Sequence, residues 1–307
     1  MLLSIQNSHL ATIFGIEESI RILKETGFDA YDMSLFDMAY SDEYIFNTDE
    51  YKQYAKKLRR CADSLGIVCN QAHAPFPSSF GNREKDEDMY FKIVRSMEIA
   101  SILGAKIIVV HPKQHLRFAT KGNPQLLEEI NIDFYRSLIP YCKKFNIKVA
   151  AENMFQWDGA EDRALDSTCS AGDEFVRYID RIDSDEIVAC LDIGHVQILN
   201  HDITEMIKAL GHDRLKALHI HDNDGRHDLH TLPYTVHFGH FIDFEAFAKA
   251  LADIDYDGDF TFEADNFLSR FPNELKGAAT RLTAETGRLL MKMIEAKKGQ
   301  CVTGIIS

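Results

Sequence analysis

The sequence predicts an α/β protein that forms one (β/α)₈ barrel. Short β-branched apolar runs alternate with longer amphipathic stretches from one end of the chain to the other, and no linker, low-complexity tract or break in composition divides its 307 residues. Single barrels commonly run to about 250 residues or more. A doubly wound open sheet is the alternative, but no Gly-rich phosphate fingerprint supports it. We therefore expect one domain over residues 1–307.

Eight apolar runs are predicted as the strands of this barrel: 2–6, 30–35, 68–74, 107–111, 148–154, 187–193, 215–220 and 260–264. The stretches between them carry apolar residues at spacings of three and four, which is typical of amphipathic helices. Three residues mark helix ends. Gly104 is a predicted stop, Asn123 before Pro124 a predicted start, and Asp243 a predicted N-cap.

The charge balance restricts the partners that the chain can bind. Lys and Arg number 34 and Asp and Glu 48, which gives a net charge of −14. Such a surface repels a phosphate backbone, so the charge counts against nucleic acid as a partner. We find no apolar run long enough to span a bilayer and expect a cytoplasmic protein without membrane contact. The six cysteines are scattered, which is typical of reduced core thiols.

One segment concentrates residues that bind metal ions. Residues 218–230 read LHIHDNDGRHDLH, and within them stand His219, His221, Asp222, Asp224, His227, Asp228 and His230. Imidazole nitrogen and carboxylate oxygen are the ligands that Zn²⁺, Mn²⁺ and similar ions take. The segment begins as an apolar strand and ends as a polar loop. A solvated acidic loop with incidental histidines is the alternative interpretation.

Residues of the same kind end the other predicted strands. These residues are His73, His111, Glu152, Asp192 with His195, His219 and Glu263. In a (β/α)₈ barrel the carboxyl ends of the strands converge on the functional site. Each residue alone has an ordinary structural explanation. Six consecutive strands ending this way indicate a shared site, because buried charges and imidazoles are costly without partners.

The motifs HPKQH, AAENMF, LDIGH, LHIHDND and FTFEAD, taken in this order, resemble those of the xylose isomerase-like TIM barrels. That superfamily includes sugar isomerases, ketose 3-epimerases, inosose dehydratases and AP endonucleases of the endonuclease IV type. The resemblance covers nearly the whole chain. For epimerase-like members it implies a single divalent ion held by Glu152, Asp192, His219 and Glu263. His221 with Asp224 has the same spacing as His219 with Asp222, so His221 remains the alternative ligand.

The endonuclease-like members hold three zinc ions with additional ligands. The resemblance matches His73 and His111 to one further ion, with Glu152 bridging. It matches His195, Asp228 and His230 to the third. We therefore expect one to three divalent ions per chain, of Mn, Zn, Co or Mg, since mixed nitrogen and oxygen ligands suit several metals.

The function implied by the resemblance is that of a metal-dependent isomerase or epimerase acting on a sugar, a sugar phosphate or a polyol. Glu152 and Glu263 would transfer the proton through a metal-stabilised enediolate. Residues expected to contact the substrate are His195, Asp158, Arg226 and His221. A homo-oligomer is possible, and the sequence does not decide it.

A multi-zinc phosphodiesterase of the endonuclease IV type is the alternative function. The complete set of nine ligand positions supports this alternative. The net charge of −14 opposes it, as do the segments SIQNSHLATIFG and HFGHFID, which depart from the family pattern.

Overall fold

The computed structural model of the chain describes residues 1–114, 123–236 and 242–303. The last residue of HPKQH and residues 237–241 of HFGHFID lie outside the described residues, so the predictions about them stay open.

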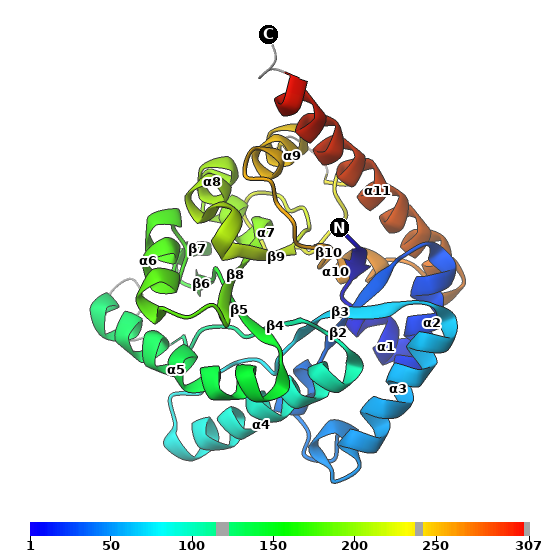
Figure 1. Cartoon of the computed structure of the whole chain (residues 1–307), viewed down its shortest axis with the longest axis vertical. Coiled ribbons are helices and arrows are strands. Elements are labelled where there is room, and N and C mark those ends of the chain that lie inside the picture. The colour runs from blue at the N-terminus through cyan, green and yellow to red at the C-terminus, as the bar shows by residue number, and fades with distance from the viewer. Residues whose placement is uncertain (115–122, 237–241, 304–307) are drawn as a thin grey trace.

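The described residues form a closed ring of parallel strands inside a ring of helices (Figure 1). The strands are β1 (Leu3–Ile5), β2 (Ala30–Ser34), β3 (Val68–His73), β4 (Ile107–Val109), β5 (Lys148–Glu152), β8 (Ile187–Asp192), β9 (Leu215–His219) and β10 (Phe260–Phe262). Strands β2-β3-β4-β5-β8-β9 pair in that order, and β1 pairs with β10. Parallel bridges between Gln6 and Asp32 and between Ile220 and Phe262 join these two sheets into one barrel. The predicted (β/α)₈ barrel is confirmed.

The helices follow the strands around the outside of the ring. They are α1 (Ser8–Phe14), α2 (Ile16–Thr26), α3 (Tyr51–Leu65), α4 (Arg83–Leu103), α5 (Pro124–Phe145), α6 (Gly172–Ile182), α7 (Ile193–Ile198), α8 (Ile203–Arg214), α9 (Phe244–Asp253), α10 (Asp265–Ser269) and α11 (Asn273–Thr303), with 3₁₀ turns η1 (Phe36–Ala39) and η2 (Ile45–Asn47). The predicted ends are confirmed: Asn123 and Asp243 accept hydrogen bonds from Leu126 N and Ala246 N, and Gly104 ends α4 at φ 102°.

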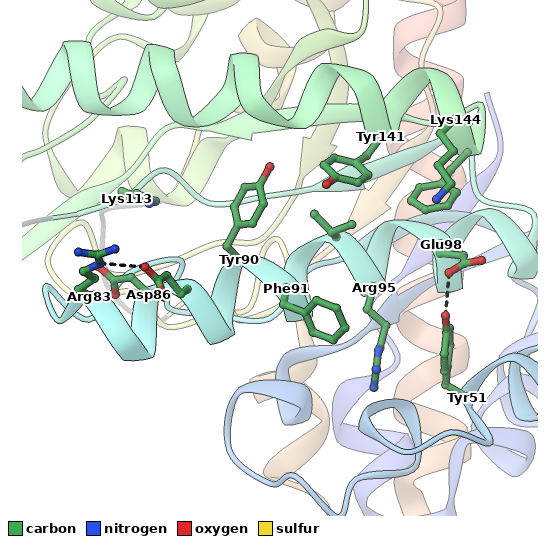
Figure 2. Close-up of a pocket in the computed structure, with 13 residues that line it drawn as sticks. Tyr51, Arg83, Asp86, Tyr90, Phe91, Arg95, Glu98, Lys113, Tyr141 and Lys144 are labelled. Carbon is green, nitrogen blue, oxygen red and sulfur yellow. Dashed lines mark hydrogen bonds and ion pairs between the residues drawn. The ribbon is translucent and has the colours of Figure 1, made fainter.

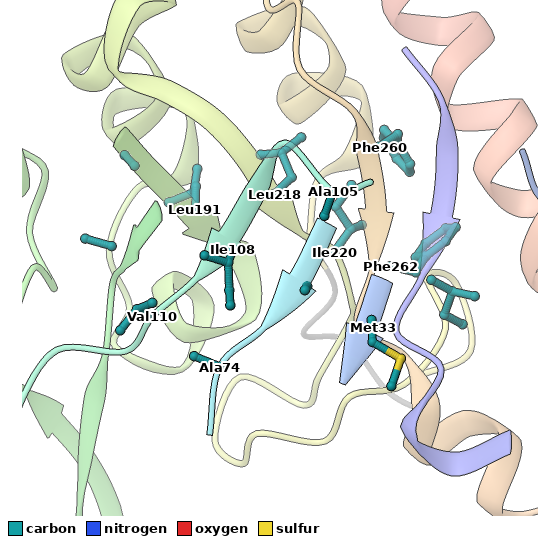
Figure 3. Packing of buried hydrophobic residues seen from close by; sticks show 14 of the residues in the cluster. Met33, Ala74, Ala105, Ile108, Val110, Leu191, Leu218, Ile220, Phe260 and Phe262 are labelled. Carbon is teal, nitrogen blue, oxygen red and sulfur yellow. The ribbon is translucent and has the colours of Figure 1, made fainter. Parts of the chain in front are cut away.

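The apolar residues of the strands fall into two hydrophobic clusters. The larger one packs outward-facing strand residues against the helices, and Figure 3 shows Ile108, Val110, Leu191 and Leu218 among them. The smaller cluster consists of the residues that alternate with these. We call it the barrel floor, and it comprises Val109, Ala150, Val188, Cys190 and Ala217. Because side chains alternate across a strand, the next inward positions toward the carboxyl ends are occupied by the predicted site residues.

One pair of strands was not predicted. β6 (Phe155–Asp158) and β7 (Arg163–Asp166) form an antiparallel hairpin directly after β5.

Among the described residues, no helix has both the length and the apolar character that crossing a membrane requires.

Candidate metal centre

The nine predicted ligands gather at the carboxyl end of the barrel. We call this set the barrel mouth: His73, His111, Glu152, Asp192, His195, His219, Asp228, His230 and Glu263. Seven of them are buried, and Asp228 and His230 are partly buried in the loop after β9. Seven ionisable side chains withdrawn from water at one place require partners or ions to offset the cost of desolvation.

A first group of ligand atoms surrounds His219. Its Nδ1 atom lies 3.0 Å from Glu152 Oε1, 3.2 Å from Glu263 Oε2 and 4.0 Å from Asp192 Oδ2. One ligand atom from each of these four residues lies within 4.8 Å of all the others. Four nitrogen and oxygen donors at this spacing suit a single divalent ion.

The charges within this group are strongly coupled. Burial raises the pKa of Glu152, but the neighbouring His219 and His111 rings outweigh burial and hold that pKa well below its usual value. Burial likewise raises the pKa of Asp192, and the charges of His195 and His221 bring it below normal. Both carboxyl groups are therefore ionised near neutral pH and available to a cation.

A second group consists of His195, Asp228 and His230, whose ligand atoms also lie within 4.8 Å of one another. Asp192 caps α7 by accepting a hydrogen bond from His195 N at 2.8 Å, and this turn brings His195 into the mouth. His195 Nδ1 donates to the carbonyl of Asn153 at 2.7 Å, so its Nε2 atom faces Asp228 Oδ2 at 3.5 Å. His230 Nε2 lies 2.9 Å from the same oxygen.

The remaining two histidines do not lie in one group. His111 Nε2 lies 3.0 Å from Glu152 Oε2, next to the first group. His73 instead forms a third group with Asp32 and His219. Its ring stacks on that of His219 with centroids 4.3 Å apart.

The residues of the mouth fit divalent metal ions. Several of their buried polar atoms have no hydrogen-bond partner among the described residues: His73 Nε2, His111 Nδ1 and Asp228 Oδ1. Unpartnered buried polar atoms are rare and costly. Lone pairs of nitrogen and oxygen gathered at one place are what a metal ion requires of its ligands.

The residues expected to contact substrate lie in different surroundings. His221 is buried, with Nε2 3.1 Å from Asp192 Oδ1, and its ring stacks on that of His230 with centroids 4.3 Å apart. Asp158 lies on the hairpin, where its Oδ1 atom accepts a hydrogen bond from Ala160 N at 3.0 Å. Arg226 is exposed and pairs with Asp162 at 2.8 Å. The roles of these residues toward a substrate stay predictions.

The polar segment 218–230 divides into two parts. Asp222 and Asp224 accept backbone hydrogen bonds within their own loop, and Asp224 also contacts His227 Nδ1 at 2.9 Å. The other part faces the mouth and consists of His219, His221, Asp228 and His230. Some of the ligand-type residues in this segment thus stabilise the loop, and the others belong to the candidate metal centre.

Sequence reasoning missed three buried polar residues of the barrel interior. Gln6 Nε2 donates to Glu263 Oε1 at 2.9 Å. Gln71 Nε2 donates to Asp32 Oδ2 at 3.0 Å. A signal for Asp32 was present in the sequence, since an acid inside the apolar run AYDMS is unusual for a buried strand.

A large hollow of the described surface lies elsewhere. It has a volume of about 840 Å³. Figure 2 shows its lining residues, which come mainly from α3, α4 and α5 on the outside of the barrel. Its walls include Tyr51, Tyr90, Phe91, Arg95 and Tyr141, and none of its lining residues belongs to the mouth. We therefore place the candidate site at the mouth, on its chemistry, rather than in this hollow.

The family model for the xylose isomerase-like TIM barrel matches residues 20–284. The chain belongs to this family. The resemblance inferred from the sequence motifs is therefore confirmed.

Two curated relatives align with part of the chain. An uncharacterised protein of Sinorhizobium fredii, y4fM, is 29% identical over 168 residues, which cover 54% of this chain and 50% of the relative. A probable endonuclease 4 of Oceanobacillus iheyensis is 27% identical over 195 residues, which cover 59% of this chain and 61% of the relative. The chain thus spans only half to three fifths of the length of these relatives.

Solved structures resemble the chain over nearly its whole length. A D-tagatose 3-epimerase-like protein superposes with a TM-score of 0.73 at 18% identity and covers 97% of this chain and 99% of its own. The IOLI protein, solved with a zinc atom, gives a TM-score of 0.70 at 15% identity and covers 97% and 99%. At these identities the likeness shows the fold.

Proposed function

We propose that the protein is a divalent-metal-dependent isomerase or epimerase of a sugar, a sugar phosphate or a related polyol. The observation that carries this proposal is the pair of buried carboxylates at His219 Nδ1, with Glu152 Oε1 at 3.0 Å and Glu263 Oε2 at 3.2 Å. Epimerase structures among the neighbours in fold support it.

Glu152, Asp192, His219 and Glu263 would hold the ion. A bound divalent ion supplies Lewis acidity, which polarises a carbonyl oxygen and makes the neighbouring C–H more acidic. Because Asp192 is fixed by His195 N and by His221, it is suited to holding a ligand position rather than to moving a proton.

Glu152 and Glu263 would carry the proton. Glu152 ends β5 and Glu263 directly follows β10. Because β8 and β9 separate these two strands in the ring, the two carboxylates approach the centre from different directions. One removes the proton from the substrate carbon, and the other delivers a proton to the enediolate. Delivery of the proton to the opposite face of the same carbon would epimerise that carbon, and delivery to the neighbouring carbon would isomerise the sugar. The lowered pKa of Glu152 makes it a weak base in the absence of substrate. The C–H of the substrate must therefore be made more acidic before Glu152 can remove its proton.

The test is exchange of the substrate's carbon-bound hydrogen with solvent deuterium, for a panel of ketoses and ketose phosphates. We expect Glu152→Gln and Glu263→Gln each to slow exchange by at least about 100-fold, because positioned acid–base groups contribute factors of that order. Glu161→Gln, in the exposed turn of the hairpin, is the matched control and should exchange like the wild type. The metal content of each variant separates loss of the base from loss of the ion. Full exchange by either mouth variant with metal bound would contradict the assignment.

A second function is supported by a specific observation, the group His195, Asp228 and His230. A single-ion epimerase does not need these three residues as metal ligands. Relatives named probable endonuclease 4 support a multi-zinc phosphodiesterase of the endonuclease IV type. There the mouth would hold zinc ions that activate water against a phosphodiester. Cleavage of abasic-site DNA or of bis(p-nitrophenyl) phosphate, without hydrogen exchange in any ketose, would favour this function.

A further inference from the structure

A carboxylate inside the barrel has no part in the proposed reaction. Asp32, on β2, is completely buried. Its Oδ2 atom lies 2.8 Å from His73 Nδ1 and accepts a second hydrogen bond from Gln71 Nε2 at 3.0 Å. Its Oδ1 atom has no hydrogen-bond partner among the described residues. A buried carboxylate is expensive, so its two contacts at one oxygen require an explanation.

Two contacts of His73 Nδ1 decide which ring nitrogen carries the proton: Asp32 Oδ2 lies at 2.8 Å, and Gln6 Nε2 lies at 3.3 Å. Gln6 Nε2 makes its shorter hydrogen bond to Glu263 Oε1, at 2.9 Å. The Asp32 contact is the shorter one at Nδ1, and a carboxylate oxygen accepts, so the hydrogen lies on Nδ1 and the lone pair on Nε2. The distance of 2.8 Å is that of a charge-assisted hydrogen bond.

The Nε2 atom of His73 then faces the metal centre without a donor. It is buried, has no hydrogen-bond partner in the part of the chain that the structure describes, and lies 3.6 Å from Glu263 Oε1. A second proton on Nε2 would not satisfy it, since 3.6 Å is too long for a hydrogen bond. A nitrogen lone pair and a carboxylate oxygen that face each other repel unless a cation lies near both.

We propose that Asp32 is the positioning residue that holds His73 in the tautomer and orientation of a metal ligand. Carboxylates that accept the second ring N–H of a ligating histidine are a recurrent feature of metal sites. Gln71 holds the same Oδ2 atom of the carboxylate by a second hydrogen bond, and its Nε2 atom also lies 3.1 Å from His219 Nε2. The inference rests on the proposed metal centre and adds a further residue to it.

The first test compares the affinity of Asp32 variants for Zn²⁺ and Co²⁺ by competition with a chelator. Asp32→Ala should weaken the binding of an ion by about 10- to 100-fold, the usual effect of losing such a partner. Asp32→Asn should stay within about threefold of the wild type, because its amide oxygen still accepts the N–H. Asp29→Ala is the matched control: it removes a carboxylate that pairs with Arg288 outside the mouth, and metal affinity should not change. Should the alanine variant fail to fold, Asp32→Val fills the space without an acceptor and carries the same expectation.

The second test asks whether Asp32 acts through His73. In a His73→Ala background, Asp32→Ala should produce no further loss of metal affinity, which a merely structural role would not predict. Wild-type affinity in a folded Asp32→Ala protein would overturn the proposal. Equal losses in the alanine and asparagine variants would also overturn it, since they would make Asp32 itself a ligand. A wild-type protein that binds no divalent ion would refute the metal centre as well as this inference.

Discussion

The barrel floor and the barrel mouth are built on the same strands, yet their side chains behave oppositely. The floor residues on β4, β5, β8 and β9 are small, apolar and packed against one another. Two residues further along the same strands stand His111, Glu152, Asp192 and His219, ionisable side chains with unpartnered atoms among them. The floor thus stabilises the protein by burial of apolar surface, and the mouth holds groups whose desolvation costs stability.

The comparison shows how register places chemistry in this fold. Because side chains alternate along a strand, a site residue two positions after a floor residue points into the same interior. Pairing of Glu152 with Cys190 and of Asp192 with His219 then sets them in neighbouring strands. The packed floor holds these strands in place and thereby fixes the positions of the ligands.

The largest expected effect is a change in metal content. If the second group holds an ion, Asp228→Ala combined with His230→Ala should remove about one equivalent of metal per chain, because these residues form that group with His195. Elemental mass spectrometry checks this. An unchanged metal count would show that the pair serves substrate or structure instead, and the mouth would then hold fewer ions than its ligands allow.

A substitution in the barrel floor should change the stability of the protein rather than its metal content. Val109→Ala removes two buried methyl groups, which lowers the free energy of unfolding by roughly 2 kcal/mol through lost burial and a cavity. Metal content and the exchange of the substrate's carbon-bound hydrogen with solvent should not change. Urea unfolding and metal analysis of the same sample check both statements. Loss of metal in Val109→Ala would mean that floor and mouth are not separable.

A smaller effect concerns pH. Burial lowers the pKa of His195, but Asp192 and Asp228 outweigh burial and raise it to about 10. The pKa values of His219 and His230 are raised as well. A raised histidine pKa stabilises the folded state fully below about pH 6.5, the unfolded value, and that stability is lost as the pH rises toward 10.

The metal-free protein should therefore become less stable between about pH 6.5 and 10. Zn²⁺ bound to these histidines replaces their protons, so the loss of stability with rising pH should disappear. Urea unfolding across this range, with chelator and with Zn²⁺, measures both slopes. Val109→Ala should keep the slope of the wild type. Equal slopes with and without metal would indicate that the ion does not bind these histidines.

Most of the fold followed from the sequence. All eight barrel strands lie where the apolar runs predict them, because buried parallel strands are continuous apolar segments. The predicted segments extend up to two residues beyond the observed strands. The β6–β7 hairpin was missed because FQWD and RALD are short and mixed in polarity, with neither a long apolar run nor a strict alternation.

The site was predictable only in part. The sequence and the family resemblance indicate which residues end the strands, and the structure brings them together. The grouping of His73 with Asp32 rather than with His111 depends on side-chain contacts between neighbouring strands, which spacing along one chain does not reveal. For the same reason the loop roles of Asp222 and Asp224 could not be separated from the site role of Asp228.

The most direct test of the metal centre is the metal content of the wild-type protein, purified without a metal-affinity step and analysed by elemental mass spectrometry. We predict at least one equivalent of Mn²⁺, Co²⁺ or Zn²⁺ per chain, held by Glu152, Asp192, His219 and Glu263. Close to three equivalents of zinc would extend the centre to the whole mouth and favour the phosphodiesterase. No bound metal, and none taken up from added Mn²⁺, Co²⁺ or Zn²⁺, would contradict the account.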